Sequence, residues 1–322
     1  MLDALPRTAF ALLAGSATAK RLATRYGMRG PKSFARRFVA GETIDEAIDV
    51  ARSIERQGLQ VSLDALGESA VAAAAAAEAT RTYVSIIGDL DRAGVARNLS
   101  LKLTQLGLAV DRATSIDNLR RILDAADHAG VFVRIDMESS AYTDQTLETF
   151  ETVWNIGYRN VGLIVHSSLR RSEQDVRRLN ELRAGVRLVK GAYREPRSVA
   201  VHRKADVDAA FLSLMRLLLS EGVSPAVATH DPVLLDATKA FAKSRGLGPE
   251  TFEFQTRYGI RRDLQAALAA EGYRVRVSVP FGKEWFAYFM GRLGERPANV
   301  SFVLKSLLRE RRAGKPSDEA PV

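Results

Sequence analysis

The sequence has no cysteine in its 322 residues. Disulfide bonds, thiol catalysis and cysteine metal sites are therefore excluded. Histidine is scarce as well. The four histidines show neither the H-x-H nor the H-E-x-x-H spacing of zinc sites, and we expect no metal centre. No apolar run is long enough to span a bilayer, and no G-x-S-x-G motif supports serine hydrolase chemistry.

The composition is that of a globular protein, with 46% hydrophobic and 26% charged residues. The formal net charge is +9, but the basic residues are spread along the chain and often neighbour acids, which argues against a nucleic-acid partner. An anionic ligand, or peripheral attachment to an anionic membrane surface, fits this charge better. The short apolar stretch near the N-terminus lacks a preceding basic segment. We interpret it as a leading helix and expect a cytoplasmic protein.

An apolar strand, a loop and an amphipathic helix alternate eight times along the chain. This alternation predicts a parallel sheet, and eight units in this length predict a closed (βα)8 TIM-like barrel of the α/β class. An open doubly wound sheet would normally carry a glycine-rich phosphate-binding turn after its first strand. The turn here has a single glycine, which argues against that fold. The predicted strands are 60–65, 99–104, 131–137, 160–166, 186–190, 225–229, 251–255 and 274–279. The predicted helices between and after them are 69–81, 116–128, 143–155, 171–183, 206–219, 232–244, 261–270 and 283–293.

The same pattern divides the chain into three segments. We expect a helical arm over residues 1–42, the barrel over 43–302, and a basic helix followed by a disordered tail over 303–322. Thr43 and Glu46 match a capping box at the start of the barrel segment. Ser115 is the predicted N-cap of the helix that begins at residue 116.

Polar residues interrupt the apolar strands near their carboxyl ends, where barrels of this fold carry their active sites. The segment VRLVKGAY shows this most clearly, because Arg187 and Lys190 lie in a buried strand that ends at Gly191. Buried charges need partners or a ligand, so the pattern predicts a site at the barrel mouth. The other polar residues of this kind are Asp64, Lys102, Asp136, Glu138, His166, Thr229, His230, Asp231, Glu253, Gln255, Arg276 and Ser278.

These residue types leave several chemistries open. Asp64, Asp136 and Glu138 could hold magnesium, although the cations around them already supply positive charge. Lys102 or Lys190 could form a Schiff base, as in a lyase or aldolase built on a barrel. A barrel that binds a flavin or another anion without catalysis is a third possibility.

Six motifs, in strand order, resemble the proline dehydrogenase family, and in particular its monofunctional bacterial members. They are SLKLT, RIDMES, VRLVKGAY, ATHD, FEFQ and VRVSVPFG, the last followed by a helix that ends RLGERPAN. The resemblance implies a barrel that holds FAD at its C-terminal face. It also implies hydride transfer from the carbon beside the proline nitrogen to flavin N5, release of pyrroline-5-carboxylate, and electron transfer to a quinone.

The resemblance also implies roles for individual residues. It implies a catalytic set of Lys102, Asp136, Arg187 and Tyr193, with Arg187 near flavin N5, where a cation stabilises the reduced flavin. The implied substrate contacts are Lys102 and Arg292 on the carboxylate, with Glu68, Ser278 and Tyr288 around the rest of the pocket. The implied cofactor contacts are Met137, His166, Arg187, Lys190, Gly191, Ala192, Thr229, His230, Gln255 and Glu295.

Three residues depart from the family pattern. Gly291 replaces the first of two adjacent arginines, which removes a charged contact worth about 1.5–3 kcal/mol to the substrate carboxylate. Ser278 stands where proline-specific members usually carry a tyrosine, and it makes room for a ring substituent. His166 replaces a glutamine that contacts the flavin. We therefore predict a substrate that is bulkier or more polar than proline, with trans-4-hydroxyproline as the leading candidate.

Overall fold

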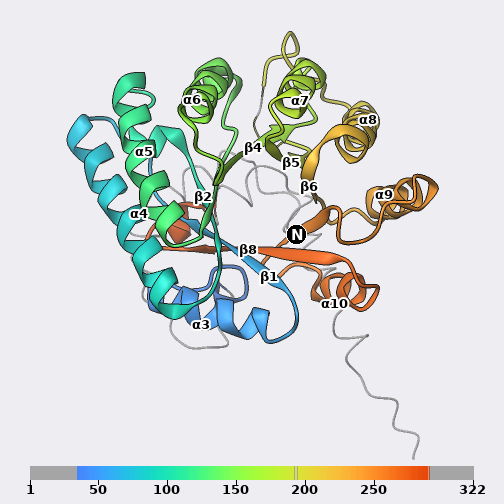
Figure 1. Cartoon of the computed structure of the whole chain (residues 1–322), viewed down its shortest axis with the longest axis horizontal. Helices are drawn as coiled ribbons and strands as arrows, with labels where there is room; N and C mark the ends of the chain where they lie inside the picture. The colour runs from blue at the N-terminus through green and yellow to red at the C-terminus, as the bar shows by residue number, and fades with distance from the viewer. Residues whose placement is uncertain (1–34, 192, 194, 289, 291–322) are drawn as a thin grey trace, which may run out of the picture.

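The computed structural model describes residues 35–191, 193, 195–288 and 290. Eight parallel strands pair in sequence order around a closed barrel, and the last strand, β8 (Arg274–Phe281), pairs with the first, β1 (Gln60–Ala65). Helices follow the strands and form a ring around the barrel (Figure 1). The predicted (βα)8 fold is confirmed.

The elements have well-defined bounds. The remaining strands are β2 (Asn98–Leu101), β3 (Phe132–Ile135), β4 (Val161–His166), β5 (Gly185–Val189), β6 (Val223–Ala228) and β7 (Glu253–Arg257). The α-helices are α3 (Ile44–Glu55), α4 (Ala73–Ala93), α5 (Arg112–His128), α6 (Thr143–Ile156), α7 (Ser172–Glu181), α8 (Lys204–Glu221), α9 (Pro232–Ser244) and α10 (Arg262–Ala270). Three short 3-10 helices are η2 (Ala35–Arg37), η3 (Leu103–Leu106) and η4 (Ser140–Tyr142).

The predicted bounds of two helices are wrong by more than two residues. Helix α4 runs to Ala93 instead of residue 81, because Tyr83, Ile86 and Leu90 continue its buried stripe beyond the alanine-rich segment. Helix α5 begins earlier than expected, and Ser115 is buried within its first turn instead of capping it. The N-cap is Asp111, whose side chain accepts a hydrogen bond of 2.7 Å from the backbone N–H of Thr114.

The interior of the barrel is polar. Side chains of a strand alternate between its two faces, so the apolar positions of each strand pack outward against the helices. Barrels of this fold are usually filled by branched apolar side chains. Here the inward positions carry buried Ser62, Ser100, Arg134, Arg187, Glu253 and Gln255.

A glycine on β4 makes room for one of these buried charges. A Cβ atom on Gly162 would lie 2.4 Å from the carbonyl oxygen of Gly185 and 2.8 Å from Nη1 of Arg134. In the space that remains, Arg134 Nη1 donates a hydrogen bond of 2.7 Å to that same carbonyl. The absence of a side chain at residue 162 thus allows the guanidinium of Arg134 to lie inside the barrel against β4 and β5.

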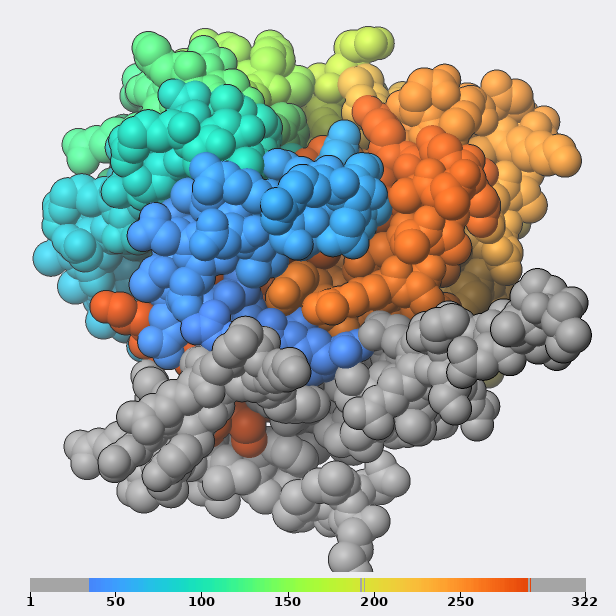
Figure 2. All heavy atoms as spheres, turned by 90° about the horizontal axis from the view of Figure 1, so that it is seen from below, coloured from blue at the N-terminus to red at the C-terminus, as the bar shows by residue number. Residues whose placement is uncertain are grey.

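Helix α3 closes the ring of helices beside β1 and β8. The predicted capping box is confirmed, with both reciprocal bonds between Thr43 and Glu46 present. Figure 2 shows this first part of the described chain next to the last part, and α3 contacts both β1 and β8. After β8 the chain stays at the mouth, where Trp285 donates a hydrogen bond of 2.8 Å to Glu42. None of the described helices has the length and apolar character that crossing a membrane requires.

Candidate active site

The carboxyl ends of the strands bring several charged groups together at the barrel mouth. Asp136 follows β3 and is partly buried, and burial raises its pKa to about 6, with a further contribution from Asp64 on β1. Arg187, Lys102 and Arg257 act in the opposite direction. Oxygen Oδ1 of Asp136 has no hydrogen-bond partner in the described part of the chain. This carboxylate is therefore available to a ligand or an ordered water.

Arg187 crosses the barrel interior from β5. Its Nη1 donates a hydrogen bond of 3.2 Å to Ser100 on β2, while its Nε and Nη2 are buried without a partner among the described residues. Burial lowers the pKa of Arg187, and the carboxylates of Asp136 and Glu253 counteract this. A buried guanidinium with unused donors is destabilising unless a ligand or water supplies acceptors.

An ion pair lies deeper in the barrel. Glu253 accepts hydrogen bonds of 3.0 and 3.2 Å from Nε of Arg276, which also donates to Gln60 and Val61 at the start of β1. Burial alone would raise the pKa of Glu253, but Arg276 and its other donors lower it. The prediction that Glu253 and Arg276 belong to the mouth is wrong, because the strand register places them one layer below it.

Lys190 lies on the other side of β5 from Arg187. It continues the outward alternation of Val186 and Leu188, and its ammonium lies 2.6 Å from Asp208 of α8 and 2.9 Å from Asp231, the N-cap of α9. Hydrogen bonds and charge from Lys190 lower the pKa of both carboxylates against the opposing effect of burial. The Lys190 ammonium is thus engaged by two carboxylates on the outer side of the barrel, whereas Arg187 enters the interior.

Gly191 follows in a conformation that suits glycine alone. Its φ is +100°, and a Cβ atom would lie 2.4 Å from the hydroxyl of Ser168. The backbone can therefore turn tightly at the end of β5, as a close approach to a ligand requires. The predicted cofactor contact at Ala192 lies outside the described residues.

A second group of predicted residues lies at the ends of β6 and β7. His230 accepts a hydrogen bond of 2.9 Å through Nε2 from the backbone N–H of Arg257, and burial, aided by Arg257 and Arg261, lowers its pKa to about 3. His230 is thus neutral at physiological pH. Thr229 accepts a hydrogen bond of 3.1 Å from the N–H of Asp231, and Gln255 donates to Glu253.

The other predicted residues are more scattered. The ring of Tyr193, 43% exposed, stacks on the buried ring of His166 with 5.8 Å between centroids. Met137 is buried in the hydrophobic core directly after Asp136. Glu68 is exposed in the loop after β1. Gly291, and the predicted contacts Arg292 and Glu295, lie outside the described residues.

Arg257 is a mouth residue that the sequence patterns did not single out. Strand β7 extends two residues past the predicted end at Gln255, and Arg257 Nη1 donates a hydrogen bond of 3.1 Å to the hydroxyl of Tyr288. The alternation of Glu253, Gln255 and Arg257 was the available signal. Glu138, in contrast, was singled out, and it accepts bonds of 2.7 and 3.2 Å from Thr104, with burial raising its pKa.

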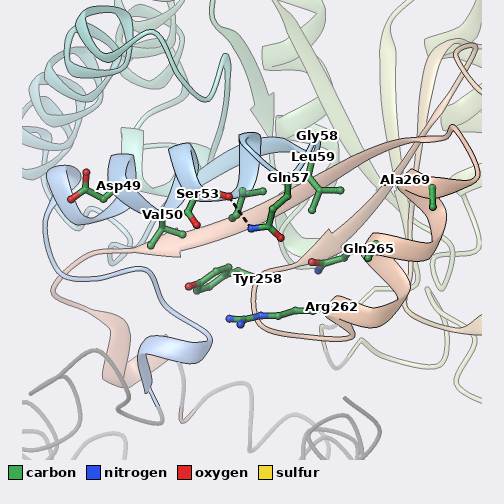
Figure 3. A pocket seen from close by; sticks show the side chains of 13 residues that line it. Asp49, Val50, Ser53, Gln57, Gly58, Leu59, Tyr258, Arg262, Gln265 and Ala269 are labelled. Atoms are coloured by element: carbon green, nitrogen blue, oxygen red, sulfur yellow. Dashed lines mark hydrogen bonds between the residues drawn. The ribbon is translucent and has the colours of Figure 1, made fainter. Parts of the chain in front are cut away.

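A separate cavity of about 680 Å³ lies on the outer flank of the barrel, between α3 and α10 (Figure 3). Val50 and Gln57 line one wall, and Tyr258, Arg262 and Gln265 line the other. None of the residues predicted for the active site lines this cavity. The mouth of the barrel is therefore the candidate active site.

The sequence of this chain was compared with models of known protein families. Residues 47–305 match the family model described as proline dehydrogenase. This chain belongs to the proline dehydrogenase family. It is therefore an oxidoreductase of the class that acts on CH–NH donors, and the resemblance read from its six motifs is confirmed.

Curated bacterial relatives match along nearly their whole length. Proline dehydrogenase of Deinococcus radiodurans is 42% identical over 281 residues, which are 86% of this chain and 91% of the relative. Proline dehydrogenase 1 of Bacillus subtilis is 39% identical over 94% of this chain and 99% of the relative.

Solved structures agree with the fold. Proline utilization A from Bdellovibrio bacteriovorus, inactivated by N-propargylglycine, superposes with a TM-score of 0.77 at 27% identity. The match covers 88% of this chain and 34% of that larger protein. The proline dehydrogenase barrel described here thus corresponds to about a third of the longer chain.

Proposed function

We propose that this protein uses FAD to oxidise proline or a ring-substituted proline to the corresponding pyrroline-5-carboxylate-type imine. The observation that carries the proposal is the buried Arg187, whose two unused donors lie in a polar barrel beside Asp136. A cation in that position suits a cofactor whose charge becomes more negative on reduction. Family membership supplies the reaction class to which this geometry is fitted.

The residues present are compatible with FAD. Gly191 lets the backbone approach a ligand, and the neutral His230 can take part in hydrogen bonds without adding charge. Thr229 follows β6 and Gln255 lies on the adjacent β7, while Met137 follows β3, and the resemblance expects cofactor contacts at these three positions. When bound, FAD would supply the acceptor for the hydride.

The protein's own groups would bind and orient the substrate. Lys102, whose side chain forms no hydrogen bond or ion pair with the described residues, would hold the substrate carboxylate together with Arg292. Asp136, with a pKa of about 6, is mostly ionised at neutral pH and would keep Lys102 and Arg187 oriented toward the ligand. Tyr193 and Tyr288 would exclude water from the ring of the substrate.

Ser278 supports a substrate with a substituted ring. It points into the barrel from β8, two residues above the inward-facing Arg276, and is only partly buried. We infer that trans-4-hydroxyproline is a better substrate than proline. A quinone as the final electron acceptor, a cytoplasmic location and peripheral contact with a membrane belong to the same proposal, and they rest on the resemblance and on the net charge of +9.

The lyase alternative has less support, because Lys190 is held between two carboxylates. A non-catalytic barrel remains the alternative to be tested. The decisive experiment records the visible absorbance of the purified protein anaerobically, before and after each imino acid is added. A yellow protein that is bleached supports the proposal. A colourless protein that binds no added FAD, or a yellow one that no imino acid bleaches, contradicts it.

A further inference from the structure

Arg257 and Ser278 lie side by side on the inner face of the barrel. They are direct partners in the register between β7 and β8. Both face inward, because the positions two residues earlier, Gln255 and Arg276, bond to the interior carboxylate of Glu253. The space that a serine leaves open at residue 278 is therefore bordered by a guanidinium.

Most of the N–H donors of the Arg257 guanidinium are not engaged by described residues. Among the described residues its side chain forms one hydrogen bond, from Nη1 to the hydroxyl of Tyr288, and no carboxylate pairs with it there. The residue is half-buried at the mouth, so its remaining N–H groups are accessible to a ligand. An arginine in such a place favours an acceptor oxygen, and a charged or strongly polar one most of all.

The position of Arg257 separates it from the end of the pocket that is proposed to hold the carboxylate. Around the closed barrel the strand order is β7, β8, β1, β2. Lys102 follows β2, whereas Arg257 ends β7, so β8 and β1 lie between them. A small ring whose carboxylate binds Lys102 would present its opposite edge to Arg257 and Ser278.

We propose that Arg257 is a specificity-determining residue, which binds a hydrogen-bond acceptor carried on the ring of the substrate. The inference rests on the proposed function and narrows its substrate class. The expected substrate is a cyclic imino acid with a hydroxyl or other acceptor group on the edge opposite its carboxylate. Ser278 supplies the space for that group, and Arg257 supplies the donor.

The test compares two ring substituents of similar size that differ in acceptor character, with unsubstituted proline as the reference. Flavin reduction is measured anaerobically with proline, trans-4-hydroxyproline and trans-4-methylproline for the wild type and for Arg257→Met. We expect the wild type to prefer the hydroxyl over the methyl compound. In Arg257→Met the ratio of the two kcat/KM values should fall about ten- to a hundredfold, because a charged hydrogen bond to the substituent is lost.

Two further variants make the result specific. Arg257→Lys keeps the charge and should retain most of the ratio. Arg245→Met removes an exposed arginine at the end of α9, far from the mouth, and should leave the ratio unchanged. Melting temperature and flavin content show whether each variant folds.

Two other outcomes would separate a failure of this inference from a failure of the proposed function. If Arg257→Met lowers kcat/KM equally for all three compounds, Arg257 acts on a shared part of the substrate, or on the fold, and the inference is wrong. If the wild type is reduced by none of the compounds, the proposed function itself fails, and the inference with it.

Discussion

Asp136 is a partly buried carboxylate that lies among the cations of the barrel mouth. Its pKa of about 6 means that the folded protein takes up its proton more readily than the unfolded chain, whose aspartate has an ordinary value near 3.8. Between these two values the folded state binds more protons, so raising the pH lowers the stability. Above pH 6 the folded protein carries a carboxylate that burial disfavours.

Replacing Asp136 with asparagine should therefore stabilise the protein without cofactor by about 1–3 kcal/mol at pH 8, and by about half as much at pH 5, which lies between the two pKa values. The same variant should slow flavin reduction, because Arg187 and Lys102 lose the carboxylate that orients them. Urea unfolding at the two pH values measures the first effect. A variant less stable than the wild type at pH 8 would show that the carboxylate is stabilised by its cations on balance.

Glu253 is the carboxylate that compensates the charges of two arginines inside the barrel. It pairs with Arg276 and also counters the charge of Arg134, whose pKa burial lowers to about 9. Substituting glutamine removes this carboxylate from the buried Arg134 and the partly buried Arg276, which should cost about 3–5 kcal/mol in unfolding free energy. The matched change Glu250→Gln, at an exposed residue before β7, should stay within about 0.5 kcal/mol.

Acid unfolding offers a second check on Glu253. Its folded pKa is lowered, so the stability that it contributes is present above the unfolded value of 4.5 and is lost as the pH falls further. The glutamine variant should lack this part of the acid dependence. An unchanged acid limb would contradict the ion pair as a source of stability.

At the scale of elements, the approach of β4 to β5 depends on Gly162. An alanine there would place its Cβ atom 2.4 Å from the carbonyl oxygen of Gly185. Backbone atoms cannot move aside easily, so Gly162→Ala should destabilise the protein by about 1–3 kcal/mol or more. Gly88→Ala is the matched control, because in helix α4 the nearest atom is 3.5 Å from its Cβ and helix propensity should yield a gain of about 1 kcal/mol.

Thermal or urea unfolding of both variants tests this contrast. Opposite signs of the stability change are expected. If both alanines are tolerated equally, β4 and β5 can separate, and the position of Arg134 beneath them does not depend on the glycine.

At the scale of the whole molecule, the polar barrel interior should couple cofactor binding to stability. A ligand that binds only the folded state stabilises it by about 2.7 kcal/mol at a free concentration one hundred times its Kd. For a chain of this size we expect FAD to raise the melting temperature by about 5 °C or more. Riboflavin, which lacks the phosphates, should give a smaller shift. Equal melting temperatures with and without FAD would contradict the proposed cofactor.

Much of the fold could be predicted from the sequence, because the evidence for it is local. Apolar runs separated by turn residues predict the strands. The bounds of β1 and α9 were predicted to the residue. The end of α4 was missed because its stripe continues past an alanine-rich stretch that resembles a complete helix. The cap at Asp111 was missed because Ser115 offers an equally suitable residue type nearby.

The sequence by itself determined the barrel, the family and the set of strand-end residues, since each depends on the order and spacing of residue types along the chain. Only the tertiary structure decided which of those residues meet. The strand register lowers Glu253 and Arg276 beneath the mouth, and the alternation of β5 turns Lys190 toward two helices while Arg187 enters the barrel. It also brings Arg257 beside Ser278 from a strand 21 positions earlier in the chain. These pairings depend on how neighbouring strands are shifted against one another, which no single stretch of sequence encodes.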